Sequence, residues 1–198
     1  MFRTIAYLQA GSNVQRRAFA AIDRLGILQD LQAYSPLLCG TIPLGIDIPG
    51  SDLDIVLEVH DLVAFQKQLQ LLYSHLPGFR LASLLVTGVP TVTCNFQFSG
   101  FDFELFAQPQ PAEQQNAYLH LLVEHHLLTA YPQVRAEIIR LKRSGLKTEP
   151  AFARVFGLSG DPYEQLLRLG SEMGVIKAPT HTPIPIEEVA HESQDVHI

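Results

Sequence analysis

The chain has 198 residues, of which 47% are hydrophobic and 17% charged, and its formal net charge is −6. This apolar content is enough for a hydrophobic core and excludes a wholly disordered chain, while the negative charge disfavours general binding to DNA. No apolar run approaches the length of a membrane span, and residues 1–5 do not open a signal peptide. We therefore expect a soluble, cytoplasmic protein that does not associate with membranes.

The first half of the chain predicts helices followed by strands. Residues 1–33 favour helix with breaks at Gly11 and Gly26, and residues 35–40 and 53–59 favour two short strands. Residues 61–75 carry apolar side chains at the spacing of an amphipathic helix, with Asp61 as the N-cap. Residues 79–87, 91–98 and 101–107 read as three further strands, and Ser99-Gly100 is a two-residue hairpin signal. Cys39 and Cys94 lie in these strand-like contexts and are expected in the core.

The second half predicts helices only. Residues 114–128, 132–144, 149–156 and 162–173 have helical patterns, separated by glycine and proline signals. The fold class is therefore α/β (α+β), with a small mixed sheet flanked by helices and then a C-terminal helical half. We expect an α/β core over residues 1–110, a helical subdomain over 111–177 and a flexible tail over 178–198.

An acidic pair gives the clearest chemical signal. Asp52 and Asp54 are two residues apart in the run S-D-L-D-I-V-L, so on a strand they share one face with α-carbons about 6.6 Å apart. Two acids on one face of a mostly buried strand are costly unless a cation compensates them. Hard oxygen ligands of this kind favour Mg²⁺, with Mn²⁺ as an alternative.

Phosphate-binding candidates lie on both sides of this pair. Gly40-Thr41, eleven residues before Asp52, offers a backbone without a side chain and then a hydroxyl, and Ser51 precedes the first acid. Residues 135–154 carry six basic residues against two acidic ones. Lys142 and Lys147 are the candidates in this block to neutralise a β- or γ-phosphate, although a solvated basic helix end would give the same pattern.

The order Gly-Thr, spacer, Asp-x-Asp resembles the nucleotidyltransferase superfamily that includes DNA polymerase beta. Four further phrases resemble a small bacterial family of nucleotidyltransferase-like proteins, and together the matching phrases extend over most of residues 5–170. They are Tyr7-Leu8-Gln9, Phe106-Ala107-Gln108-Pro109, Gly145-Leu146-Lys147-Thr148-Glu149-Pro150-Ala151-Phe152 and Gly160-Asp161-Pro162-Tyr163.

The resemblance implies a nucleotidyltransferase-type sheet and a third metal-binding carboxylate on a later strand. Asp102 and Glu104 share a face of the run F-D-F-E-L-F, and Glu104, farther from the turn, is the favoured third acid. The implied activity is Mg²⁺-dependent transfer of a nucleoside monophosphate from a nucleoside triphosphate to an acceptor hydroxyl. Asp52, Asp54 and Glu104 would be catalytic, and the acceptor, which is a small molecule, a protein or an RNA, stays open.

Two other functions remain open from the sequence. A non-enzymatic nucleotide-binding or regulatory protein would keep the fold and the nucleotide site. A zinc hydrolase would use His120 and Glu124, which are four residues apart on one predicted helix. The H-E-x-x-H order is missing, so a buried His120 hydrogen-bonded to Glu124 is the favoured interpretation of that pair.

Overall fold

The N-terminal helices cover one side of a sheet. The computed structural model describes residues 2–177. Helix α1 begins with a capping box, in which Ser12 and Gln15 each bond the other's backbone N–H, and it ends at Gly26 in the left-handed conformation. The elements before the sheet are the 3-10 helix η1 (Ala6–Ala10), α1 (Asn13–Leu25), α2 (Ile27–Asp30) and the 3-10 helix η2 (Gln32–Tyr34).

The sheet is mixed and has five strands in the order β1-β2-β5-β4-β3. Only β2 and β5 run parallel; the other neighbours are antiparallel. The turns Thr87-Gly88 and Ser99-Gly100 each place both residues at positive φ, as tight two-residue hairpins require. The strands are β1 (Leu37–Cys39), β2 (Leu53–Glu58), β3 (Arg80–Val86), β4 (Val89–Phe98) and β5 (Phe101–Gln108).

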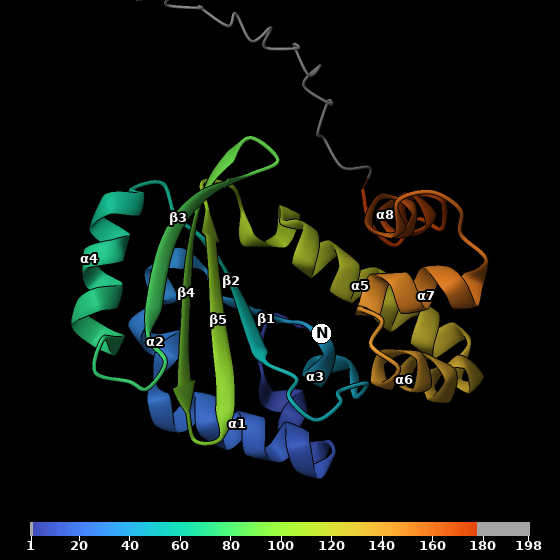
Figure 1. Cartoon of the computed structure of the whole chain (residues 1–198), viewed down its shortest axis with the longest axis horizontal. Coiled ribbons are helices and arrows are strands. Elements are labelled where there is room, and N and C mark those ends of the chain that lie inside the picture. Colours follow the sequence, from blue (N-terminus) through green and yellow to red (C-terminus); the bar gives the residue numbers. More distant parts are fainter. Residues whose placement is uncertain (1, 178–198) are drawn as a thin grey trace, which may run out of the picture.

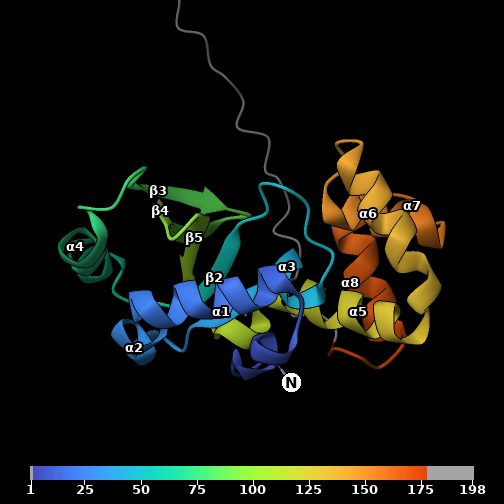
Figure 2. The same ribbon diagram turned by 90° about the horizontal axis from the view of Figure 1, so that it is seen from below.

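Helices make up the chain after β5, and they gather beside β1, away from α4 (Figures 1 and 2). Helix α4 (Leu62–Tyr73) begins at Asp61, whose carboxylate accepts a hydrogen bond from the Ala64 N–H. The short α3 (Thr41–Leu44) follows β1 directly. The later helices are η3 (Ala112–Gln114), α5 (Asn116–Ala130), η4 (Pro132–Val134), α6 (Arg135–Arg143), α7 (Thr148–Phe156) and α8 (Pro162–Glu172).

Successive side chains of a strand point to opposite faces of the sheet, and each face packs against its own hydrophobic core. Leu53, Ile55 and Leu57 of β2 point into a core shared with α1, α2 and α4. Val56, on the opposite face, belongs to a second core that holds β1 together with α5, α6, α7 and α8. The face that carries Val56 also carries Asp54, so polar side chains of the sheet face the helical half.

The predicted fold class is confirmed as a mixed sheet flanked by helices, with each strand and long helix within a few residues of its predicted range. Strand β4 begins earlier than predicted, because Pro90 pairs with Leu85 on the edge strand β3, a position that tolerates proline. Among residues 2–177, no helix is both long and apolar enough to cross a membrane. The predicted tail, residues 178–198, lies outside the described residues, and the subdomain boundary near residue 110 stays a prediction.

Candidate active site

Three acidic side chains meet on the sheet face that looks toward the helical half. The parallel register places Asp54 of β2 directly beside Glu104 of β5, and Asp52 lies two residues before Asp54. One ligand oxygen from each of the three lies within 4.8 Å of the others. We call Asp52, Asp54 and Glu104 the carboxylate cluster. Among residues 2–177, no other three His, Cys or acidic side chains come close enough to share a metal ion.

The carboxylate cluster is electrostatically strained. Burial, followed by the neighbouring charges of Asp52 and Glu104, raises the pKa of Asp54 from 3.8 to about 7. Burial and Asp52 also raise the pKa of Glu104, although a hydrogen bond from Asn95 and the charge of Lys147 partly offset this. Like-charged carboxylates held this close favour a bound cation or a retained proton.

The backbone of Gly40 lies so close to the Asp54 carboxylate that no side chain fits at this position. Cys39 pairs with Asp54 across β1 and β2, so the next residue, Gly40, passes over the Asp54 carboxylate. Gly40 has a φ of 79°, and a Cβ atom there would overlap Oδ2 of Asp54. Glycine is therefore required at this position both by the backbone and by the contact.

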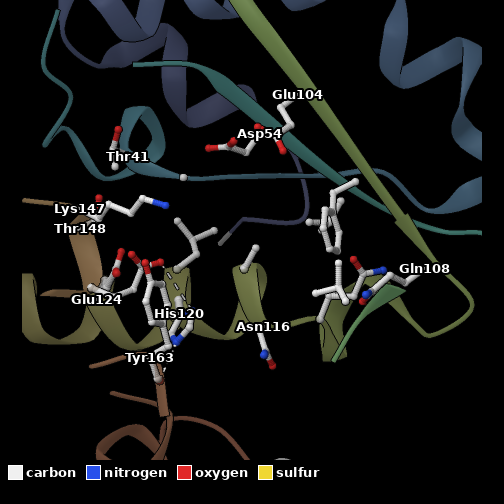
Figure 3. A pocket seen from close by; sticks show the side chains of 18 of the residues that line it. Thr41, Asp54, Glu104, Gln108, Asn116, His120, Glu124, Lys147, Thr148 and Tyr163 are labelled. Atoms are coloured by element: carbon white, nitrogen blue, oxygen red, sulfur yellow. Dashed lines mark hydrogen bonds and ion pairs between the residues drawn. The ribbon is translucent and has the colours of Figure 1, made fainter. Parts of the chain in front are cut away.

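A cavity of about 530 Å³ lies between the carboxylate cluster and the helical half. Thr41, Asp54 and Glu104 line its sheet side, and Figure 3 shows Lys147, Glu124, His120 and Tyr163 facing them from the helical side. Thr41 donates its hydroxyl hydrogen bond to Ser51 Oγ at 3.3 Å. The sequence-distant halves of the chain therefore form one site.

The structure brings some predicted residues to this cavity and leaves others outside it. Lys147 lines the cavity, whereas Lys142 is 6% exposed and donates from Nζ to the Ile46 carbonyl at 3.0 Å. Ser51 is not a lining residue; its Oγ accepts from the Ile48 N–H and holds the loop. Asp102 is exposed, is not part of the carboxylate cluster, and accepts a hydrogen bond from Gln97 Nε2 at 2.9 Å.

His120 is buried as predicted, but its partner is not Glu124. Its Nε2 lies 2.9 Å from the Tyr163 carbonyl, and its Nδ1 lies 3.8 Å from Glu149 Oε1. The first contact comes from α8, which packs on α5, and the second comes from α7, which packs on α8. Helical spacing along α5 cannot reveal either contact. Within residues 2–177, His120 and Glu124 belong to no three-ligand cluster, so the zinc site lacks its remaining ligands.

Several lining residues had no role assigned from the sequence. Gln108, Glu149 and Tyr163 line the cavity, and each lies in one of the phrases that carried the family resemblance. Gln108 Nε2 donates to Thr91 Oγ1 at 2.9 Å, which fixes the amide at the end of β5. The phrases were the available signal, but a phrase alone does not say which of its side chains turns inward.

The fold and the site together define a mixed α/β protein that carries a carboxylate cluster on the helix-facing side of its sheet. Residues 20–169 match the family described as "Domain of unknown function (DUF4269)", and the chain belongs to that family. No curated protein sequence matches the chain.

Solved structures of a poly(U) polymerase and a poly(A) polymerase show a weak similarity to the chain. The Cid1 RNA terminal uridylyl transferase matches over 90% of this chain and 53% of its own, at 15% identity and a TM-score of 0.49. The GLD-2–GLD-3 poly(A) polymerase complex matches over 68% of this chain and 47% of its own, at 17% identity and a TM-score of 0.44. The chain thus spans about half the length of these proteins. Similarity at this level carries no argument about activity, which must rest on the chain's own geometry.

Proposed function

We propose that this protein is a divalent-metal-dependent nucleotidyltransferase that transfers a nucleoside monophosphate from a nucleoside triphosphate to an acceptor hydroxyl. The observation that carries the proposal is the register of the parallel strands β2 and β5, which sets Asp54 beside Glu104 with Asp52 close by. The cluster opens onto a cavity large enough for a nucleotide, with Thr41 on one side and Lys147 on the other.

The residues of the cluster fit a divalent cation. Their ligand atoms lie within 4.8 Å of one another, and all three donors are hard oxygens. Burial and the negative charges of Asp52 and Glu104 raise the pKa of Asp54, and a bound cation would counteract both effects. Asp52, Asp54 and Glu104 would hold Mg²⁺ or Mn²⁺. When bound, the metal supplies charge neutralisation for the phosphates and lowers the pKa of the attacking hydroxyl.

The chain's own groups position the reactants. In the transfer, the acceptor oxygen forms a bond to the α-phosphorus, the bond from that phosphorus to the β-phosphate oxygen breaks, and pyrophosphate leaves. Glu104 takes the proton of the acceptor hydroxyl. Thr41 and Lys147 hold the β- and γ-phosphates. Lys142 is assigned a structural role instead, because its ammonium already bonds to the Ile46 carbonyl.

A thermal-shift panel tests this proposal. The wild type and the Asp52→Asn/Asp54→Asn variant are melted with each of the four nucleoside triphosphates, with and without Mg²⁺. Because a ligand that binds only the folded state raises the melting temperature, we expect a Mg²⁺-dependent rise with at least one triphosphate in the wild type and none in the variant. Glu172→Gln, an exposed substitution on α8 away from the cavity, is the control and should behave as the wild type.

The outcomes separate the remaining alternatives. Binding followed by pyrophosphate release in the presence of a suitable acceptor supports the enzyme. Binding that persists without turnover across an acceptor screen favours the non-enzymatic nucleotide-binding protein. A rise that is equal in the wild type and the double variant would show that the carboxylate cluster is not the nucleotide site.

A further inference from the structure

Glu124 is a buried carboxylate with no partner in the described part of the chain. Its side chain lies on α5, lines the cavity and is 4% exposed. Its Oε1 atom is buried and accepts no hydrogen bond from residues 2–177. Figure 3 shows Glu124 on the helical side of the cavity, facing the region between the two walls. Buried polar groups in native proteins are normally paired, so an unpaired carboxylate beside a cavity needs an explanation.

His120 and Glu149 line the same cavity as Glu124. The Tyr163 carbonyl can only accept a hydrogen bond, so Nε2 of His120 is the protonated nitrogen. Its other ring nitrogen, Nδ1, lies 3.8 Å from Glu149 Oε1. Glu149 makes no ion pair with a Lys or Arg within residues 2–177. We call Glu124, Glu149 and His120 the acceptor wall; it contains two carboxyl groups and no Lys or Arg.

Lys142 is a buried cation near Glu124, but it does not neutralise this carboxyl group. Burial and then the charge of Glu149 raise the pKa of Glu124 well above its usual value, and the ammonium of Lys142 offsets this only in part. Lys142 Nζ donates to the Ile46 carbonyl, and no ion pair within 4 Å joins it to Glu124 in the described chain. In the empty cavity the raised pKa favours a proton on Glu124, and a cation that enters the cavity could replace this proton.

The charge of the whole cavity points to the same kind of partner. Five carboxyl groups line it, and Lys147 is its one Lys or Arg among the described residues; the acids are Asp52, Asp54, Glu104, Glu124 and Glu149. A triphosphate with its metal ions engages the carboxylate cluster and Lys147, which leaves the acceptor wall uncompensated. A polyanionic acceptor such as RNA would add negative charge beside these acids, whereas an ammonium group would supply both positive charge and several N–H donors.

We propose that the acceptor wall binds a primary ammonium group of the acceptor, so that the second substrate is a small amine-bearing molecule rather than a nucleic acid. The proposal rests on the proposed function, because it takes the ligand of this wall to be the acceptor. Glu124 is a specificity-determining residue in it, and Glu149 and His120 complete the binding of the ammonium group.

Calorimetric titration of the full chain with spermidine tests this proposal. Triethylene glycol, which is uncharged and of similar shape, and a short single-stranded RNA are titrated in parallel at about 0.15 M salt, where weak surface attraction is screened. Each titration is run with and without saturating Mg²⁺. Mg²⁺ would displace a polyamine that merely occupies the carboxylate cluster, but it should not displace one that is bound at the acceptor wall.

We expect spermidine to bind the wild type in the presence of Mg²⁺, and triethylene glycol and RNA not to bind. Glu124→Gln keeps the shape and removes the charge, and it should weaken spermidine binding by about tenfold or more, since charged hydrogen bonds to buried groups are strong. Glu149→Gln should weaken it to a smaller extent. Glu172→Gln removes one exposed charge of the same type and should leave the affinity unchanged.

Three results would overturn the proposal. They are equal spermidine affinity in the wild type and Glu124→Gln, loss of spermidine binding when Mg²⁺ is added, and tighter binding of RNA than of spermidine. Circular dichroism establishes that each variant is folded, and Glu149→Gln provides an independent variant if Glu124→Gln does not fold. The thermal-shift panel measures nucleotide binding and the titration measures spermidine binding. A protein that binds a nucleoside triphosphate but not spermidine would contradict the acceptor wall alone, and one that binds no triphosphate would contradict the proposed function.

Discussion

The behaviour of single carboxyl groups is set by the register of two strands. Asp54 would be an ordinary acid in the unfolded chain, but in the fold it lies beside Glu104 and beneath Gly40. The raised pKa of Asp54 and its close contact with Gly40 lead to two predictions about single residues.

The first prediction concerns pH and the metal-free protein. The pKa of Asp54 is about 7 in the folded state against 3.8 ordinarily, so between these values the folded state holds a proton that the unfolded state has lost. The unfolding free energy contributed by Asp54 should therefore be largest below pH 4, fall as the pH rises to about 7, and then level off. The loss is expected to be a few kcal/mol, because each pKa unit corresponds to about 1.4 kcal/mol.

Calorimetric melting at pH 5 and pH 8 measures this effect. Other acids also titrate in this range, so the difference between the wild type and Asp54→Asn isolates the contribution of Asp54. Added Mg²⁺ should stabilise the wild type more at pH 8 than at pH 5, since it replaces the proton. An identical pH dependence in the wild type and Asp54→Asn would contradict the prediction.

The second prediction uses Gly40. Gly40→Ala places a methyl group against the Asp54 carboxylate and holds a non-glycine residue at a φ of 79°, so we expect a loss of about 1–3 kcal/mol in stability and the loss of Mg²⁺-dependent nucleotide binding. Gly50→Ala is the matched control, because its φ is 88° but nothing lies within 4 Å of the added Cβ. It should lose stability through backbone strain yet keep nucleotide binding, as read by thermal shift.

At the scale of elements, the helical half depends on close packing between α5 and α8. Gly170 is a buried residue of α8, and a Cβ atom there would overlap Cγ2 of Val123 on α5. The glycine therefore sets the distance between two helices that carry His120, Glu124 and Tyr163 near the cavity. Its role is packing, since its backbone is helical and any residue could adopt that conformation.

The third prediction follows from this contact. Overpacking in Gly170→Ala should cost about 1–3 kcal/mol of stability. The better helix propensity of alanine should offset about 1 kcal/mol of this cost. Val123→Ala removes the overlapping methyl group, so the double variant should be more stable than the sum of the two single effects implies. Urea unfolding of all four proteins measures the coupling, and strictly additive changes would exclude a direct clash.

At the scale of the whole molecule, the sheet half and the helical half are joined through the segment that follows Thr41. Arg135, where η4 meets α6, donates to the carbonyls of Leu44 and Gly45, the latter at 3.1 Å. Lys142, farther along α6, donates to the next carbonyl, that of Ile46. Two cationic side chains of one helix thus hold three consecutive carbonyls of the segment that follows Thr41.

The fourth prediction concerns this junction. Arg135→Met removes two charge-assisted hydrogen bonds and leaves their carbonyls to find water, so we expect a loss of about 1–3 kcal/mol and faster amide hydrogen exchange in residues 41–46. Arg140→Met removes an exposed cation of the same helix, paired with Glu137, and should change both quantities much less. Unchanged exchange in residues 41–46 would show that the junction does not depend on Arg135.

Much of the fold could be read from local patterns, because each element carries its own signal. Asp61 capped its helix as expected, and Ser99-Gly100 formed its tight turn. That Asp52 and Asp54 share one face could also be predicted locally, because side chains two residues apart on a strand point the same way. The environment of His120 could not be read in this way: its neighbours Tyr163 and Glu149 come from α8 and α7, and only packing brings them to α5.

The sequence by itself therefore determined the elements, their order, and the presence of two acids and a Gly-Thr turn near one another, because these depend on neighbours in the chain. The tertiary structure decided which later acid joins them and which cation enters the cavity. Glu104 rather than Asp102 reaches Asp54 because β5 pairs in parallel with β2 across a long crossover. Lys147 rather than Lys142 faces the cavity because α6 turns Lys142 toward the Ile46 carbonyl. Both arrangements depend on contacts between segments that are distant in the sequence, and local sequence patterns do not specify such contacts.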